Sequence, residues 1–239
     1  MKILGIDGSG LVASVAIVED DNLIGEYTTG NKKTHSQTLL PMLNQLAQMV
    51  DLELESLDAI AVAAGPGSFT GLRIASATAK GLGFSLGCPI VPVPTVDALA
   101  YNLWGCSDLI CPIMDARNQQ VYTGLYRFGQ QGEFIVVKEQ CAVAFEEIAA
   151  QINELGQPVV FLGDGVPVFE TAISQLLQVP YSFAPANCNR QHASAVATLG
   201  LKYYAAGRQT TAEAFRPEYL RLSQAERERL EREKQDGNS

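Results

Sequence analysis

The chain has 239 residues, of which 47% are hydrophobic and 18% charged, so one large domain or two small ones are expected and global disorder is excluded. A formal net charge of −9 disfavours direct binding to the phosphate backbone of a nucleic acid. The five cysteines form no C-x-x-C pair, and neither a signal peptide nor an apolar run of about 18 residues occurs, so we expect a cytoplasmic protein without disulfides or a membrane span.

The first half of the chain gives a strand-rich pattern followed by helices. Three strands are predicted first, over residues 2–6, 11–18 and 23–29. A helix, a buried strand and a second helix follow, over residues 38–50, 58–64 and 71–86. Pro41 is expected in the first turn of its helix, because proline deeper inside would kink it. The element order is therefore β-β-β-α-β-α.

The second half repeats this order. Strands, a helix, a strand and a helix are predicted over residues 109–114, 120–128, 133–139, 145–155, 158–162 and 166–177. Asp115 follows its strand as Asp7 does, and Gly163-Asp164-Gly165 follows its strand as Gly65-Pro66-Gly67 does. Two such α/β lobes facing each other predict the actin-like ATPase fold (ASKHA, ribonuclease H-like), with a cleft between the lobes.

The predicted domain organisation has four parts. Residues 1–105 form an N-terminal lobe and residues 106–190 a C-terminal lobe. Residues 191–222, a terminal helix and an extended segment, pack back on the lobes. Residues 223–239 are a charged tail, whose opposite charges three and four positions apart favour a solvated helix.

Two glycine-containing turns are candidates for a nucleotide site. Actin-like ATPases hold Mg-ATP with an acidic residue after the first strand and with glycine-rich turns in both lobes, and backbone N–H groups of such turns can cradle phosphate. The matching candidates are Asp7, Gly8, Gly163 and Gly165. Asp-Gly turns are common, however, so the alternative to a nucleotide site is that these are ordinary turns at strand ends. The second acidic candidate, Asp115, stands beside Arg117, which could pair with it. We predict at most a vestigial nucleotide cleft, without a bound cofactor.

Catalytic and metal-binding patterns are missing from the sequence. His35 and His192 are the only histidines, and no H-x-x-x-H or H-E-x-x-H pattern occurs, so no metal site is predicted. No G-x-S-x-G nucleophile motif is present. We therefore predict no catalytic residue.

The two helices of the first lobe carry apolar or small stripes. On the helix over 71–86, Gly71, Ala75, Ala79 and Gly83 recur every four residues, which lets another backbone approach closely. Three explanations stay open: packing on the protein's own sheet, a phosphate site at the helix N-terminus, or binding of a partner chain. If a partner binds, the candidate interface residues are Leu39, Leu43, Leu46, Val50, Gly71, Leu72, Ala75, Thr78, Ala79 and Leu82.

A long motif identifies a known family. The run from Gly65 to Ile74, continued by Ala77 to Leu82, resembles the signature of the TsaB (YeaZ) family. Shorter matches occur at Ile6-Asp7, His35-Ser36-Gln37, Pro94-Thr95, Met114 to Arg117, Gly163-Asp164-Gly165, Tyr219-Leu220-Arg221 and Ala225-Glu226. Members are dimerization subunits of the bacterial complex that adds threonylcarbamoyl to adenosine 37 of tRNA.

The resemblance implies a non-catalytic scaffold with protein partners. It implies binding to a TsaD-type catalytic subunit, assembly with a TsaE-type ATPase, a possible homodimer through the helices of the first lobe, and contact with tRNA only through the complex. It also favours the partner-binding explanation of the stripes. TsaD keeps a metal-binding histidine pair, whereas the corresponding stretch here, Pro94 to Leu99, contains no histidine. The alternatives are a stand-alone ATP-dependent phosphotransferase of the same fold and a metal-dependent peptidase.

Overall fold

The computed structural model describes residues 1–30 and 34–221, so the predicted charged tail lies outside the described residues. Its N-terminal half is built on one five-stranded sheet in the order β3-β2-β1-β4-β5. The strands are β1 (Lys2–Asp7), β2 (Ala13–Glu19), β3 (Asn22–Thr29), β4 (Ala59–Gly65) and β5 (Ile90–Pro94). β1 runs antiparallel to β2 and parallel to β4.

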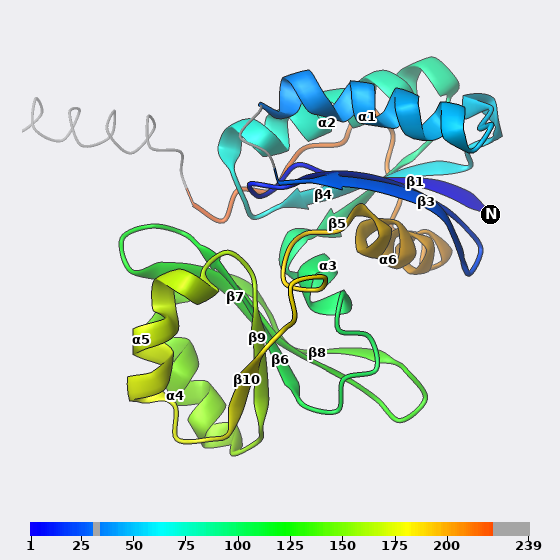
Figure 1. The fold of residues 1–239 in the computed structure, drawn as a ribbon. Coiled ribbons are helices and arrows are strands. Elements are labelled where there is room, and N and C mark those ends of the chain that lie inside the picture. The colour runs from blue at the N-terminus through cyan, green and yellow to red at the C-terminus, as the bar shows by residue number, and fades with distance from the viewer. Residues whose placement is uncertain (31–33, 222–239) are drawn as a thin grey trace, which may run out of the picture.

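Helices cover both faces of this first sheet (Figure 1). The helices α1 (His35–Met49) and α2 (Phe69–Leu86) lie on one face, and α6 (Ala193–Ala205), from the end of the chain, lies on the other. A 3-10 turn, η1 (Leu54–Ser56), precedes β4, and α3 (Thr95–Tyr101) leads to the second half. The sheet is thus the middle of a three-layer lobe.

The second half repeats the topology of the first. Its sheet has the order β8-β7-β6-β9-β10, which matches β3-β2-β1-β4-β5 strand for strand. The elements are β6 (Leu109–Asp115), β7 (Gln120–Phe128), β8 (Phe134–Ala144), α4 (Phe145–Leu155), β9 (Val159–Leu162), α5 (Val166–Leu176) and β10 (Tyr181–Phe183). This internal repeat confirms the predicted actin-like fold. The proposed lobes, 1–105 and 106–190, each hold one of the two sheets.

Three element predictions were wrong. Helix α1 begins at His35, because Thr34 is extended (ψ 144°) and the next residues are helical. Pro41 is therefore the seventh helical residue, not part of the first turn; it is exposed, so the Gln37 carbonyl that loses its N–H partner lies on the solvent side. Strand β8 continues to Ala144 because its pairing with β7 continues, and the short β10 was missed.

A very close approach joins α6 to the first sheet. A Cβ atom on Gly5 would lie 2.2 Å from the carbonyl oxygen of Ala193, so only glycine fits at this position of β1. The start of α6 is held by Glu26 of β3, which accepts hydrogen bonds from the Ser194 N–H and hydroxyl, both at 3.0 Å. An acceptor at a helix N-terminus satisfies N–H groups that have no partner within the helix.

A buried aspartate connects three elements where the lobes meet. Asp97 of α3 accepts hydrogen bonds from the hydroxyl of Tyr126 on β7 at 2.8 Å and from that of Tyr203 on α6 at 2.9 Å. Burial raises the pKa of Asp97, although these two bonds oppose the shift. Because the two tyrosines come from different lobes, Asp97 helps to hold the lobes together.

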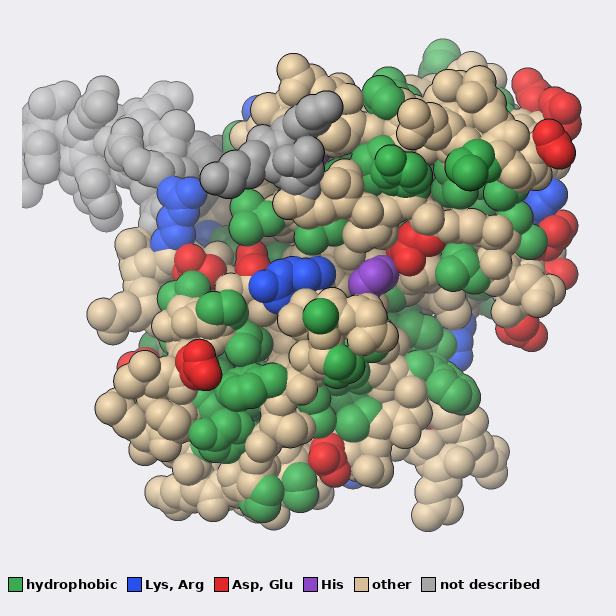
Figure 2. All heavy atoms as spheres, viewed as in Figure 1, with side chains coloured by type: hydrophobic (Ala, Val, Ile, Leu, Met, Phe, Trp, Pro, Cys, Tyr) green, Lys and Arg blue, Asp and Glu red, His purple; other side chains and the backbone are tan. Residues whose placement is uncertain are grey.

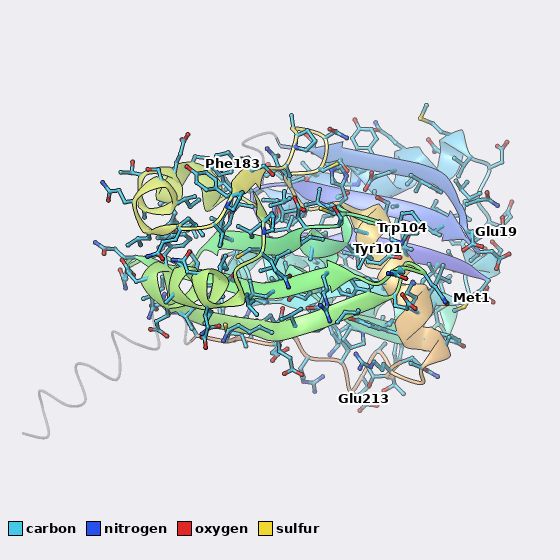
Figure 3. The ribbon with its side chains drawn as sticks, turned by 90° about the horizontal axis from the view of Figure 1, so that it is seen from below. Met1, Glu19, Tyr101, Trp104, Phe183 and Glu213 are labelled. Atoms are coloured by element: carbon cyan, nitrogen blue, oxygen red, sulfur yellow. The ribbon has the colours of Figure 1, made fainter. Side chains whose placement is uncertain are left out.

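The view from below shows the same region of the molecule (Figure 3). Tyr101 and Trp104 lie beside α6, and Phe183 and Glu213 lie at opposite edges of the molecule.

Candidate functional site

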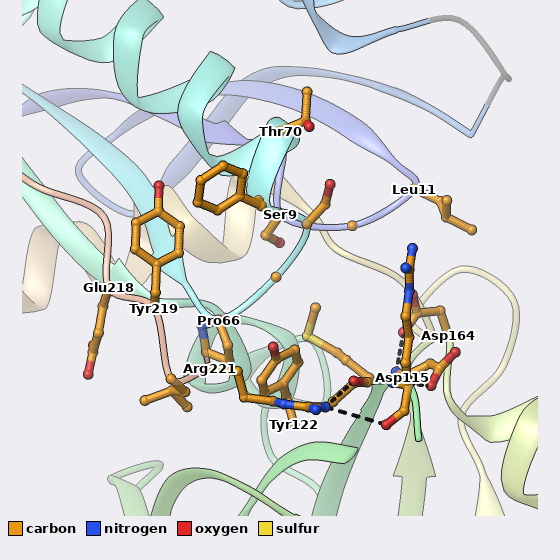
Figure 4. A pocket seen from close by; sticks show the side chains of 18 residues that line it. Ser9, Leu11, Pro66, Thr70, Asp115, Tyr122, Asp164, Glu218, Tyr219 and Arg221 are labelled. Atoms are coloured by element: carbon orange, nitrogen blue, oxygen red, sulfur yellow. Dashed lines mark hydrogen bonds between the residues drawn. The ribbon is translucent and has the colours of Figure 1, made fainter. Parts of the chain in front are cut away.

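A cleft of about 580 Å³ lies between the two lobes (Figure 4). Its walls come from the turn after β1, the N-terminus of α2, the turn after β6, and the last described residues of the chain. The lining residues are Ser9, Gly10, Leu11, Pro66, Gly67, Ser68, Phe69, Thr70, Met114, Asp115, Ala116, Arg117, Tyr122, Asp164, Glu218, Tyr219, Leu220 and Arg221. This is the place where the fold class would hold a nucleotide.

On the N-lobe side, one oxygen of the buried Asp7 carboxyl is bonded within the described part of the chain and the other is not. Asp7 is only 1% exposed, and its Oδ1 accepts hydrogen bonds from the N–H (2.8 Å) and hydroxyl (2.6 Å) of Ser9. The Ser9 carbonyl in turn accepts from the Ser68 N–H at 2.7 Å. The turn after β1 is therefore packed against the start of α2, while Asp7 Oδ2 stays buried without a hydrogen-bond partner among the described residues.

The four predicted nucleotide-site residues flank the cleft but do not line it. Gly8 is pressed against α2, since a Cβ on Gly71 would lie 2.0 Å from the Gly8 carbonyl oxygen. Gly163 has φ +109°, and its Cβ would lie 2.2 Å from the Ile113 carbonyl oxygen. Close backbone packing thus explains the glycines at these turns, and nucleotide binding through them stays a prediction.

On the C-lobe side, an unusual turn faces the cleft. Three successive residues, Arg117, Asn118 and Gln119, have left-handed backbone conformations, with φ of 61°, 54° and 58°. The Arg117 N–H donates to Asp115 Oδ1 at 2.8 Å, and the Asp115 N–H donates to Asp164 Oδ1 at 3.2 Å. Burial raises the pKa of Asp164, and the neighbouring Asp115 charge adds to the shift.

The two histidines do not come together as a metal site. His35, the first residue of α1, shares a hydrogen bond of 2.9 Å between its Nε2 and the Gly10 carbonyl, whereas His192 precedes α6 and its Nδ1 lies 3.1 Å from Glu26 Oε2. Within residues 1–30 and 34–221, no group of three or more His, Cys, Asp or Glu residues is arranged to hold a metal ion. In the same part of the chain, no helix is long and apolar enough to cross a membrane.

The buried carboxyl of Asp7 gives a testable pH dependence. Burial raises the pKa of Asp7 to about 6, above its ordinary value of 3.8, although the Ser9 hydrogen bonds oppose the shift. The folded state therefore binds the proton more tightly than the unfolded state, and stability falls as the pH rises from about 4 to about 6. A shift of this size corresponds to about 3 kcal/mol.

The Asp7→Asn variant is expected to lose this contribution. Between pH 4 and pH 7, the wild-type protein should lose about 2–3 kcal/mol of unfolding free energy relative to Asp7→Asn, because only the wild type carries the titrating carboxyl. Urea unfolding at both pH values measures it, and taking the difference removes the titration of the other carboxyl groups. A difference that is independent of pH would contradict the assignment.

The structure corrects the interpretation of the small-residue stripe. Five of the predicted interface residues are buried in the core between the helices and the first sheet, namely Leu39, Leu43, Leu46, Ala75 and Ala79. Leu72 is fully buried too. Gly71 is buried as well, and the remaining three, Val50, Thr78 and Leu82, are half-buried. The stripe allows α2 to pack closely on its own lobe, so the buried residues are not on a surface that a partner can contact.

Several exposed residues of the same helices are apolar, beside polar ones such as Gln45 and Gln48 of α1. Leu40 and Met49 of α1 and Phe84 of α2 are 52%, 80% and 83% exposed. Figure 2 shows hydrophobic side chains gathered over α1 and the neighbouring sheet edge, with acidic side chains at the same end of the lobe. We define the outward face as six exposed residues of α1 and α2: Leu40, Pro41, Met49, Ala77, Gly81 and Phe84.

The outward face also has small residues at a helical spacing. Ala77, Gly81 and Ser85 recur every four residues on the exposed side of α2, parallel to the buried stripe. A Cβ on Gly81 would meet nothing within 4 Å, so the protein's own packing does not require glycine there. The sequence contained this second stripe, but spacing alone did not distinguish it from the buried one.

Comparison with known proteins identifies the family. The model of the family "TsaD: tRNA N6-adenosine threonylcarbamoyltransferase" matches residues 22–229. The chain is 36% identical to the tRNA threonylcarbamoyladenosine biosynthesis protein TsaB of Bacillus subtilis, over 98% of this chain and all of that protein. It is 29% identical to the TsaB protein of Escherichia coli, over 69% of this chain and 72% of that one. The structure of YeaZ from Pseudomonas aeruginosa superposes with a TM-score of 0.78 at 28% identity, covering 92% of this chain and 99% of that one.

Proposed function

Since the chain belongs to the TsaB family of tRNA threonylcarbamoyladenosine biosynthesis proteins, we propose that it is a non-catalytic scaffold subunit that binds and activates a TsaD-type catalytic subunit. The outward face of α1 and α2 is the proposed binding surface. A TsaE-type ATPase joins the same complex, and tRNA is reached only through it. We place the protein in the cytoplasm.

The observation that carries this proposal is the exposed Gly81 on the same side of α2 as the exposed Ala77 and Phe84. Glycine inside a helix costs about 1 kcal/mol relative to alanine, and no described residue occupies the space that Gly81 leaves. A second polypeptide packed against α2 does need that space, because small residues let two helices approach closely. Phe84 of the same helix, and Leu40 and Met49 of α1, are exposed apolar side chains that add contact area.

The cleft supports the non-catalytic part of the proposal. Asp7, the candidate acidic residue of a nucleotide site, is buried and bonded to Ser9, and it does not line the cleft. The turn on the N-lobe side has its Ser9 carbonyl engaged by Ser68.

The experiment that tests the proposal is the substitution Phe84→Arg. A charged side chain in the middle of the outward face should weaken binding to the TsaD-type subunit of the same organism about 30-fold or more, because a desolvated aromatic anchor is lost and a charge is buried. Calorimetric titration of the two purified proteins measures the affinity. Sedimentation of wild type and of Phe84→Arg, each without the partner, shows whether a homodimer uses the same face.

Val168→Arg serves as the matched control. Val168 is also an exposed apolar residue of a helix, α5, but it lies in the other lobe. Thermal unfolding of both variants should match wild type. If Phe84→Arg binds the partner as tightly as Val168→Arg does, the outward face is not the binding surface.

A further inference from the structure

The last described residues form a strap that crosses from one lobe to the other. We call residues 207–221 the C-terminal strap; it contains no helix or strand of three or more residues. It starts after α6, follows the free edge of β5 and ends in the cleft between the lobes (Figure 1). Its contacts are of different kinds at its two ends.

The first part of the strap is anchored in the N-lobe. The backbones of Thr210 and Ile90 exchange two hydrogen bonds of 2.8 Å, so the strap continues the sheet beyond β5. The Phe215 side chain is buried in the core beneath α2. Lys80 of α2 donates to the carbonyl oxygens of Glu213 (3.3 Å) and Phe215 (3.1 Å). This part of the strap is a fixed component of the lobe.

The middle of the strap lies against the end of β4. The Glu218 N–H donates to the Ala64 carbonyl at 2.7 Å, and a Cβ on Gly65 would lie 2.1 Å from the Glu218 carbonyl oxygen. Tyr219 packs on Phe69 at the start of α2, with ring centroids 5.1 Å apart. The strap therefore enters the cleft along the N-lobe wall.

The end of the strap is bonded to the C-lobe. Arg221 donates through its Nη1 to the carbonyl oxygens of Ala116 and, at 3.4 Å, of Arg117, across the cleft (Figure 4). Gln140 of β8 reaches the strap from the same lobe and donates to Glu218 Oε2 at 3.5 Å and to the Gly65 carbonyl at 3.1 Å. A segment rooted in one lobe thus holds the turn 115–119 of the other.

We propose that the C-terminal strap is an internal latch that holds the two lobes closed. In an actin-like ATPase a bound nucleotide holds the lobes closed instead. Arg221 is the positioning residue of the latch, because its guanidinium bridges from the strap to the carbonyl oxygens of the opposite turn. The lobes then keep one relative orientation without a ligand. This inference does not depend on the proposed partner, so a failure of either leaves the other standing.

The latch predicts an opening of the lobes when Arg221 is replaced by glutamine. Spin labels attached through unnatural amino acids at Glu55 and Glu170, both exposed and one in each lobe, report the distance between the lobes. Arg221→Gln should broaden the distance distribution toward longer values. Amide exchange at Gln120, whose N–H donates to the Arg117 carbonyl, should accelerate about 10-fold or more.

Two controls isolate the contact across the cleft. Arg216→Gln removes the same charge from the strap, but within the described residues the hydrogen bonds of Arg216 go to carbonyls of the strap itself, those of Glu213 and Phe215. A chain ending at Pro217 keeps Phe215 but loses the latch, whereas a chain ending at Arg221 keeps both and is the second control. The lobes should open in Arg221→Gln and in the chain ending at Pro217. The two controls, Arg216→Gln and the chain ending at Arg221, should behave as wild type.

Addition of Mg-ATP to the wild-type protein completes the test. The distance distribution should stay unchanged, because the strap already bridges the lobes. Two results would overturn the proposal: an unchanged distribution in both Arg221→Gln and the chain ending at Pro217, or a shift of the wild-type distribution on addition of Mg-ATP.

Discussion

Replacement of Ala75 by arginine is expected to unfold the N-terminal lobe. Ala75 is fully buried between α2 and the first sheet, and its Cβ lies close to the backbone of Gly8. An arginine there would place an unpaired charge in the core and force the helix away from the turn after β1. We expect a loss of at least about 4 kcal/mol, a large part of the 5–15 kcal/mol that stabilises a typical domain.

Ala77→Arg is the matched control for Ala75→Arg. Ala77 is two residues further along α2 and points outward, so its arginine stays in water. Circular dichroism and urea unfolding should show a folded Ala77→Arg variant with wild-type stability and a largely unfolded Ala75→Arg variant. Equal stability of the two variants would contradict the orientation of α2. A loss of partner binding in Ala75→Arg would therefore report unfolding and not a lost contact.

Replacement of Phe215 by alanine is expected to cost about 3–5 kcal/mol of unfolding free energy. Phe215 is 1% exposed, and it lies in the strap, outside any helix or strand. Its ring completes the core beneath α2, together with Ala212 and Ile90. Truncation of a buried aromatic side chain removes its transfer free energy and leaves a cavity. Urea unfolding at a concentration where the protein is monomeric measures the loss.

Phe84→Ala provides the comparison for Phe215→Ala. The same side chain is removed, but Phe84 is 83% exposed, so the stability of the monomer should change by no more than about 0.5 kcal/mol. A loss below about 1 kcal/mol in Phe215→Ala would show that the strap is only loosely attached. In that case the latch proposal would lose its N-lobe anchor as well.

The repeat of strands and helices was predictable because it depends on local signals. Apolar runs such as Ile60 to Ala64, and the glycine turns after them, mark buried strands by composition alone. Alternation and helical spacing then fix the order of elements, and the second half carries the same order. The start of α1 was not predictable from Pro41, because a proline tolerated at the seventh helical position leaves no sequence signal for a start at His35.

The candidate site was predicted only in outline. The turns after β1 and β6 and the turn Gly163-Asp164-Gly165 do border one cleft, but the residues that line it are neighbours of those predicted. Asp7 turns inward to Ser9, a local hydrogen bond that spacing does not reveal. The strap residues Glu218 to Arg221, far away in the sequence, supply another wall of the cleft.

The sequence by itself determined the order of the elements, the doubled lobe and the family, since these depend on periodicity and on a long motif that is read residue by residue. Only the tertiary structure decided which side of α2 faces the core. Both sides carry small residues every four positions, and helical spacing is the same on either side. The choice depends on where the sheet lies relative to the helix, and that is set by contacts between residues distant in the chain.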